Sequence, residues 1–202
     1  MTRTHITVFV LVAIVALVLG LTVNKVLSSK GQGDPAALLD AGIVLLPQPR
    51  SLPALTLTNQ DGKAVAVDQL KGDWTLLFFG YTHCPDVCPT TMGEMAGWFE
   101  ALGDDAAELR AFFVTVDPAR DTPEVLDGYV SWVSDRITAL TGPQTEIDKI
   151  VKAWAAVAER VDGDNGDYTM NHTASVYLIN PQGGFEGTIA YGESQETAVG
   201  KI

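Results

Sequence analysis

The chain of 202 residues contains two cysteines, Cys84 and Cys88, which are separated by three residues. They lie in the stretch Cys84-Pro85-Asp86-Val87-Cys88-Pro89, directly after an apolar run at residues 74–79 that predicts a buried strand. Two thiols at this spacing can form a disulfide, exchange disulfides with a partner or bind a metal ion. A purely structural disulfide is the weakest of these interpretations, because a bond across three residues restricts the unfolded chain little.

The prolines of this stretch limit its conformation. Pro89 has no backbone N–H and would clash with the carbonyl of Pro85 in a continuous helix. We therefore expect the helix to begin near Pro89 and residues 84–88 to form a tight turn. Thiolates near a helix N-terminus are stabilised by its partial positive charge, so lowered thiol pKa values are expected here.

The elements that position the cysteines follow the order β-hairpin, β, α, β, α, β, α, β, β, α. The predicted strands cover residues 54–58, 64–67, 74–79, 110–116, 137–140, 175–179 and 185–190, and the predicted helices cover residues 90–102, 121–134, 143–157 and a short segment from 192. Strands separated by helices imply parallel pairing with helices on both faces of the sheet. The pattern predicts an α/β domain over residues 52–202, with a thioredoxin-like sheet and an N-terminal β-hairpin extension.

A third candidate metal ligand is His172, in a predicted loop just before the strand at residues 175–179. In a thioredoxin-like layout this loop packs against the cysteine loop. Two thiolates and one imidazole form a soft set of low coordination number that suits copper, whereas zinc prefers a fourth ligand. His83 adjoins Cys84 but is not expected to bind, because neighbouring side chains on an extended chain point apart. Met92 and Met95 are expected in the core.

The N-terminal part has a different composition from the rest. Residues 8–23 are uncharged and mostly apolar, which is about the length of a helix that crosses a membrane. We expect residues 1–30 to be an uncleaved single-pass anchor with its flanks, and the Pro- and Gly-containing residues 31–51 to be a linker. The alternative is a cleaved secretory signal, although no small-x-small cleavage site follows the apolar run. Residues 1–30 hold three basic and no acidic residues, which leaves a net charge of −15 for residues 31–202. Such a domain repels nucleic acid.

Three segments together resemble the Sco/SenC family of copper proteins. The first is the cysteine stretch, preceded by Phe79-Gly80-Tyr81-Thr82-His83. The second is Val116-Asp117-Pro118-Ala119-Arg120-Asp121-Thr122-Pro123-Glu124. The third is His172-Thr173-Ala174-Ser175-Val176-Tyr177-Leu178-Ile179. They occur in the family's order, and the resemblance covers about residues 50–192.

The resemblance implies a thioredoxin-like, membrane-tethered metallochaperone that helps assemble the dinuclear copper site of cytochrome c oxidase. It implies that Cys84, Cys88 and His172 bind copper, as Cu(I), Cu(II) or both. Asp117 and Asp121 match acidic positions of the family and are candidate supporting residues, although Asp121 can equally be the cap of the helix that follows. The implied location is the inner (cytoplasmic) membrane, with the domain facing the periplasm. The implied partners are the copper-site subunit of the oxidase, a periplasmic copper donor and a thioredoxin-like reductant.

Two other functions use the same cysteines. A thiol–disulfide oxidoreductase could reduce the cysteines of the apo-oxidase copper site, and this activity would make the chain an enzyme. The CxxxC spacing differs from the CxxC of thioredoxins, and His172-Thr173 stands where thioredoxins place a cis-proline. A peroxiredoxin-type peroxidase would need a Thr and a Pro at the positions of Tyr81 and Leu77, and that pattern is absent.

Overall fold

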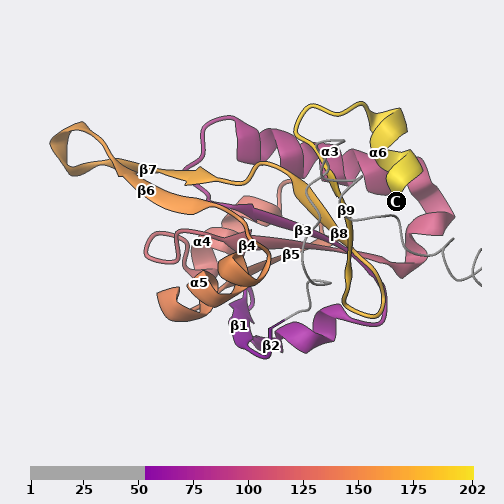
Figure 1. The fold of residues 1–202 in the computed structure, drawn as a ribbon. Coiled ribbons are helices and arrows are strands. Elements are labelled where there is room, and N and C mark those ends of the chain that lie inside the picture. Colours follow the sequence, from indigo (N-terminus) through magenta and orange to yellow (C-terminus); the bar gives the residue numbers. More distant parts are fainter. Residues whose placement is uncertain (1–52) are drawn as a thin grey trace, which may run out of the picture. The chain divides into compact units, whose positions relative to one another are not determined.

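The computed structural model describes residues 53–202, which form a seven-stranded sheet and a separate two-stranded sheet (Figure 1). The large sheet has the order β2-β1-β5-β4-β3-β8-β9. Its strands are β1 (Thr56–Asn59), β2 (Ala64–Ala66), β3 (Trp74–Gly80), β4 (Leu109–Thr115), β5 (Ile137–Thr141), β8 (Val176–Ile179) and β9 (Phe185–Ile189). The small sheet pairs β6 (Ala158–Asp162) with β7 (Tyr168–His172).

The pairing directions confirm the thioredoxin-like prediction. Strands β3, β4 and β5 are parallel, whereas β8 and β9 continue the sheet in antiparallel directions. The N-terminal β1–β2 hairpin joins the edge of β5, also antiparallel. Because β3 and β4 are parallel, the loops that follow them meet at one edge of the sheet, where open α/β sheets place their ligands. The chain that enters the antiparallel strand β8 reaches the same edge.

Helices cover both faces of the sheet, as the alternation of strands and helices predicts. They are α3 (Val87–Leu102), α4 (Pro123–Val130), α5 (Gln144–Ala153) and α6 (Gln195–Lys201), with short 3-10 helices at η1 (Val67–Leu70), η2 (Gly103–Glu108) and η3 (Asp164–Gly166). Figure 1 shows α3 and α6 together on one side of the sheet. Helix α4 lies on the same side as α3, since its Tyr129 packs on the Phe113 ring that also faces Cys88. Helix α5 covers the other side, where Trp154 at its end packs on Tyr177. The core between them includes Met92 and Met95, which are fully buried as expected.

Three predicted elements differ from the structure. Helix α3 begins at Val87, so Cys88 lies in its first turn; Pro89 is tolerated there because the first turn has no intrahelical partners for its N–H groups. Strands β6 and β7 lie where the sequence predicted the end of a helix followed by loops. The polar stretch at residues 162–167 forms the hairpin turn between them. Helix α5 ends at Ala153, so Val157 at the end of the helix predicted over residues 143–157 lies outside it and is 49% exposed.

The predicted membrane anchor at residues 1–30 and the linker at residues 31–51 lie outside the described residues. Within residues 53–202, no helix is both long and apolar enough to cross a membrane.

Candidate metal centre

The two cysteines lie where β3 passes into α3. Cys88 is fully buried in the first turn of the helix, and Cys84 is half-buried in the loop before it. The backbone N–H of Cys88 donates to Cys84 Sγ at 3.4 Å. Both thiols are free. The loop therefore holds two sulfur atoms side by side without joining them.

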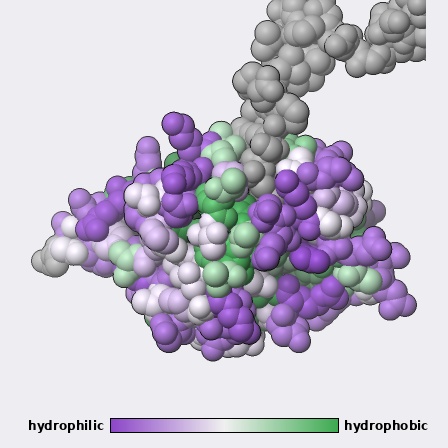
Figure 2. Space-filling model, turned by 90° about the horizontal axis from the view of Figure 1, so that it is seen from below, coloured by the Kyte–Doolittle hydropathy of each residue, from purple (hydrophilic) through white to green (hydrophobic). Residues whose placement is uncertain are grey.

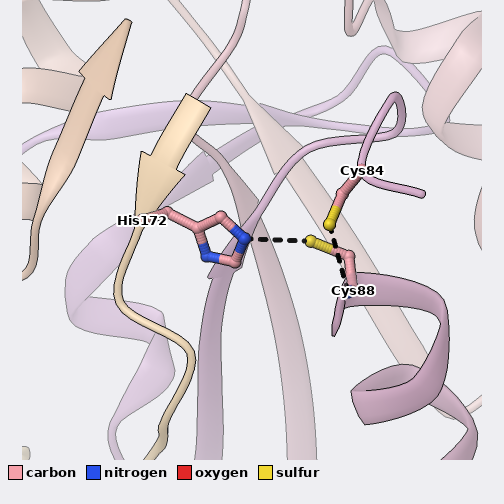
Figure 3. Close-up of side chains that lie close together, drawn as sticks. All are labelled: Cys84, Cys88 and His172. Atoms are coloured by element: carbon pink, nitrogen blue, oxygen red, sulfur yellow. Dashed lines mark hydrogen bonds between the residues drawn. The ribbon is translucent and has the colours of Figure 1, made fainter. Parts of the chain in front are cut away.

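His172, the last residue of β7, completes the group. Its Nε2 lies 3.4 Å from Cys88 Sγ, and the ligand atoms of Cys84, Cys88 and His172 all lie within 4.8 Å of one another (Figure 3). The Nδ1 atom is 3.1 Å from the carbonyl oxygen of Thr173. Because a carbonyl only accepts, a proton on Nδ1 satisfies this contact and leaves the lone pair of Nε2 facing Cys88 Sγ.

Aromatic side chains hold the imidazole in place. The rings of Phe78 and Tyr81 pack edge-on against His172, with centroid distances of 5.9 and 5.7 Å. The sequence places both residues in or just after the buried strand, but nothing in its pattern marks them as walls of this site.

Tyr129 Oη is buried, and it has no hydrogen-bond partner among the described residues. Burial, followed by the charges of Cys88 and Cys84, raises the pKa of Tyr129.

Burial determines the protonation states at the centre. It raises the pKa of the Cys88 thiol far above its ordinary value of 9.0. The prediction of a lowered thiol pKa is therefore wrong for Cys88, because desolvation of the thiolate outweighs the helix N-terminus. Burial lowers the pKa of His172 below 6.5, although hydrogen bonds to the backbone of Thr173 and Phe79 act in the opposite direction. At neutral pH the centre holds a protonated Cys88 and a neutral imidazole, and metal binding must release protons.

Asp121 is fully buried behind the cysteine loop. Its carboxylate accepts hydrogen bonds from Thr82 N at 3.1 Å, Thr82 Oγ1 at 2.6 Å and Thr115 Oγ1 at 2.5 Å. The helix cap is Thr122, whose side chain accepts from Val125 N, so the alternative of Asp121 as a cap is wrong. Burial raises the pKa of Asp121, and these hydrogen bonds oppose the shift. Asp121 thus ties the loop after β4 to the residues that precede Cys84.

Asp117 and His83 lie outside the group of three. Asp117 is 4% exposed and bonds to Arg120 and Tyr168, on the side of the β6–β7 hairpin. The His83 side chain is exposed, and its Nδ1 lies 3.1 Å from Thr82 Oγ1. Among the described residues, we find one group of His, Cys or carboxylate side chains that lie close enough together to hold a metal ion. It consists of the two cysteines and His172. Two sulfurs and one nitrogen form a donor set for a soft metal of low coordination number.

Comparison with known proteins agrees with this geometry. The SCO1/SenC family model matches residues 47–202. A protein of Stutzerimonas stutzeri described as copper-binding is 39% identical over 158 residues, which cover 77% of this chain and 78% of that protein. The mitochondrial protein SCO2 of Saccharomyces cerevisiae is 34% identical over 149 residues, which cover 72% of this chain but half of the yeast protein's length.

A solved structure shows the same fold with metal. ScoI of Bradyrhizobium japonicum, solved with copper bound, is 41% identical and superposes with a TM-score of 0.69 over 74% of this chain and 96% of that one. The family match spans most of the chain and includes the cysteine loop, the loop after β4 and His172. This chain therefore belongs to the SCO1/SenC family.

Proposed function

We propose that the chain is a copper-binding metallochaperone that helps assemble the dinuclear copper site of cytochrome c oxidase. The observation that carries this proposal is the convergence of Cys84, Cys88 and His172 at one edge of the sheet. Thiolate and imidazole ligands suit copper, and their low number suits a cargo that must leave again. The family's role in oxidase assembly supports the choice of client.

The three residues differ in solvent exposure and would therefore have different roles in copper uptake. Cys84 is half-buried and meets incoming metal first, whereas Cys88 is buried and needs a bound cation to displace its proton. His172 presents a neutral, correctly oriented nitrogen. A set of three ligands leaves room for a ligand from the client subunit during transfer.

Copper titration of the reduced, purified full chain tests the proposal. We expect about one copper per chain with thiolate-to-metal absorption for Cu(II), and tight Cu(I) binding in competition with a chelator. His172→Ala should weaken binding and change the absorption. If His172→Ala altered neither affinity nor spectrum, the three-ligand site would be wrong. In cells, Cys84→Ser and Cys88→Ser should each lower oxidase activity, and added copper should restore part of it.

The second candidate function is reduction of the oxidase cysteines, which the two free and adjacent thiols favour. In that reaction the Cys84 and Cys88 thiols become a disulfide while a client disulfide becomes two thiols, with two electrons and two protons transferred. The raised pKa of Cys88 disfavours it, because exchange requires a thiolate. His172→Ala distinguishes the two functions, since it removes a copper ligand and keeps both thiols. Oxidase activity that survives His172→Ala and responds to a thiol reductant would favour the reductase.

We further propose that residues 1–30 anchor the domain in the cytoplasmic membrane, with the domain in the periplasm. The uncharged run at residues 8–23 supports this location. An oxidising periplasm would convert the two ligands into a disulfide, so a thioredoxin-like reductant is needed beside the copper donor. Removal of residues 1–30 should release the domain from the membrane fraction, and retention there would contradict the anchor.

A further inference from the structure

The β6–β7 hairpin, which carries His172, projects from the sheet as a separate two-stranded ribbon (Figure 1). An isolated hairpin of two strands is marginally stable in water. The side chains of β6 are mostly exposed, and the projecting part at the left of Figure 2 has a mainly hydrophilic surface. The part near the sheet packs on the core, through Ala158, Met170 and His172. Other contacts are needed to hold the hairpin in one position.

One face of β7 connects the outer part of the hairpin to the metal centre. Tyr168, Met170 and His172 are half-buried, whereas Thr169 and Asn171 between them are exposed. Alternate residues of a strand share a face, so the three side chains point toward the body of the domain. Tyr168 and His172 are four residues apart, or about 13 Å along the strand. A displacement at Tyr168 is therefore passed to His172 by the strand itself.

Tyr168 is held by Asp117 and Arg120 from the loop after β4, and we call these three residues the clasp. Tyr168 Oη donates to Asp117 Oδ1 at 2.8 Å, and Arg120 Nε forms an ion pair with the same carboxylate. Arg120 Nη1 donates to the carbonyl oxygen of Tyr168 at 3.1 Å, and Arg120 Cζ lies 3.6 Å from the centroid of the Tyr168 ring. These contacts join the hairpin to the main sheet.

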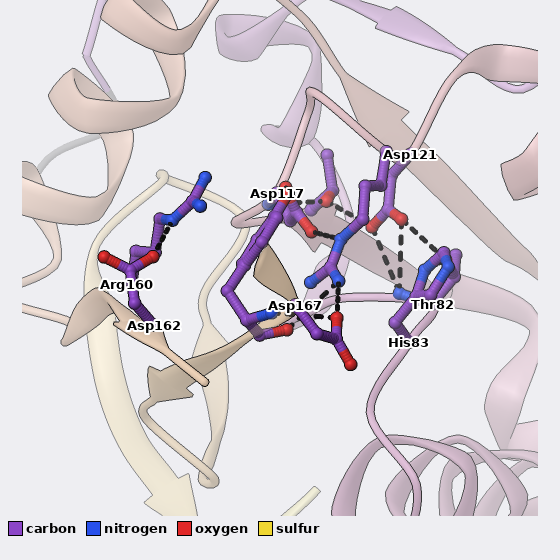
Figure 4. A network of polar contacts seen from close by, with 10 residues as sticks. Thr82, His83, Asp117, Asp121, Arg160, Asp162 and Asp167 are labelled. Carbon is purple, nitrogen blue, oxygen red and sulfur yellow. Dashed lines mark hydrogen bonds and ion pairs between the residues drawn. The ribbon is translucent and has the colours of Figure 1, made fainter. Parts of the chain in front are cut away.

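The clasp is better shielded from water than other charged pairs of the hairpin. The side chains of Arg120 and Asp117 are 19% and 4% exposed, whereas those of Arg160 and Asp162 are 55% and 77% exposed. Figure 4 shows the Arg160–Asp162 pair apart from the network around Asp117. Buried pairs are screened less by salt, and exposed pairs contribute little. The clasp thus holds the hairpin through a better shielded ion pair than Arg160–Asp162.

Arg120 also reaches the wall of the metal centre. Its Cζ lies 5.8 Å from the centroid of the Tyr81 ring. The Tyr81 hydroxyl is hydrogen-bonded to the backbone of Met170, and its ring packs edge-on against His172. A single guanidinium therefore contacts both the hairpin and the aromatic wall beside the imidazole.

We propose that Arg120 and Tyr168, joined through Asp117, are positioning residues that hold the hairpin so that His172 stays beside the cysteines. The inference deepens the proposed function, since it rests on His172 as a copper ligand. When the clasp is weakened, the hairpin spends less time in the binding-competent position, and the apparent dissociation constant rises by the inverse of that fraction. A competent fraction reduced to about one tenth weakens copper binding about tenfold. The loss of copper affinity in His172→Ala is the upper limit for the loss that a clasp variant can cause.

Hydrogen exchange of the copper-free full chain is the first test, because it does not depend on metal. Arg120→Gln should speed exchange of the β6 and β7 amides and leave the β3 and β4 amides unchanged. Tyr168→Phe keeps the ring and loses one hydrogen bond, so it should have a smaller effect and serves if Arg120→Gln folds poorly. Arg136→Gln is the matched control, since Arg136 stacks on Phe99 at 4.4 Å and donates to the Ala106 carbonyl oxygen. Unchanged exchange of the hairpin amides in both clasp variants would overturn the proposal.

Competition with a Cu(I) chelator is the second test. Arg120→Gln should weaken Cu(I) binding about tenfold in the parent chain and have no further effect in the His172→Ala background. An equal loss in both backgrounds would overturn the proposal, because Arg120 would then act without His172. If the parent chain bound no Cu(I), the proposed function would fail. The exchange experiment would still decide whether the clasp holds the hairpin.

Discussion

Gly80, the last residue of β3, lies next to Cys88 of the metal centre, and replacement by alanine tests the packing there. A Cβ at this position would lie 2.6 Å from Phe113 Cε2 and 2.9 Å from Cys88 Sγ. Both distances are shorter than van der Waals contact. The two blocking side chains are fully buried, and the Phe113 ring packs against Phe78 and Tyr129 at centroid distances of 6.1 and 5.6 Å. Neither side chain is a flexible end that can move into solvent.

Gly80→Ala should therefore destabilise the domain and displace a metal ligand. Overpacking of a core costs about 1–3 kcal/mol, and the loss of glycine freedom in the unfolded chain returns about 0.4–1 kcal/mol. We expect a net loss of about 1–2 kcal/mol, which for about 150 residues lowers Tm by roughly 2–8 °C. Because Cys88 Sγ must shift or Phe113 must rotate, Cu(I) affinity should fall as well.

Thermal and urea unfolding of the copper-free chain, together with Cu(I) competition, measure these effects. Gly93→Ala is the control, because Gly93 lies within α3 and a Cβ there meets nothing within 4 Å. That substitution should stabilise the chain by about 0.5–1 kcal/mol and leave Cu(I) affinity unchanged. A Gly80→Ala chain as stable as the parent, with the same Cu(I) affinity, would refute the close packing of Gly80 against Cys88.

Three further predictions concern buried polar groups. Because the pKa of His172 is lowered in the folded state, the unfolded chain binds more protons below its ordinary pKa of 6.5, and the free energy of unfolding should fall as pH falls through that value. His172→Gln should flatten this part of the pH profile measured by urea unfolding, and an identical slope would contradict the buried neutral imidazole. Asp121→Ala leaves the Thr82 and Thr115 donors without their acceptor, so unfolding experiments should show a loss of about 1–3 kcal/mol for each unpaired donor. Asp127→Ala, at an exposed position of α4, should change stability by less than about 0.5 kcal/mol, and similar losses for the two variants would argue against the buried network. The raised pKa of Cys88 means that Cu(I) must displace the proton of this thiol. Cu(I) affinity should therefore rise with pH between about 6 and 8, by about tenfold per pH unit for each proton released. Chelator competition at several pH values measures this dependence, and an affinity that does not change with pH would show that Cys88 binds no copper.

The sequence by itself determined the class of the fold and the chemistry at the cysteine loop. Nearly continuous apolar runs predicted the strands at residues 74–79 and 175–179, because a strand that is buried on both faces is apolar along most of its length. The order of strands and helices then led to a parallel sheet with covering helices, which the pairing of β3, β4 and β5 confirms. Residue types alone limited the cysteine pair to a disulfide, thiol exchange or metal binding.

Only the tertiary structure decided how these residues meet and in which state. The distance between His172 Nε2 and Cys88 Sγ depends on how the antiparallel β8 and the β6–β7 hairpin bring distant residues to the end of β3. Strands β6 and β7 were not predicted, because the exposed side chains of β6 show no apolar alternation and the alternation in β7 extends over only five residues. The pKa of Cys88 reversed the expectation from the helix N-terminus, because burial is a property of the packed molecule. Local sequence specifies elements and donor types, whereas distances, burial and protonation arise from contacts between residues far apart in the chain.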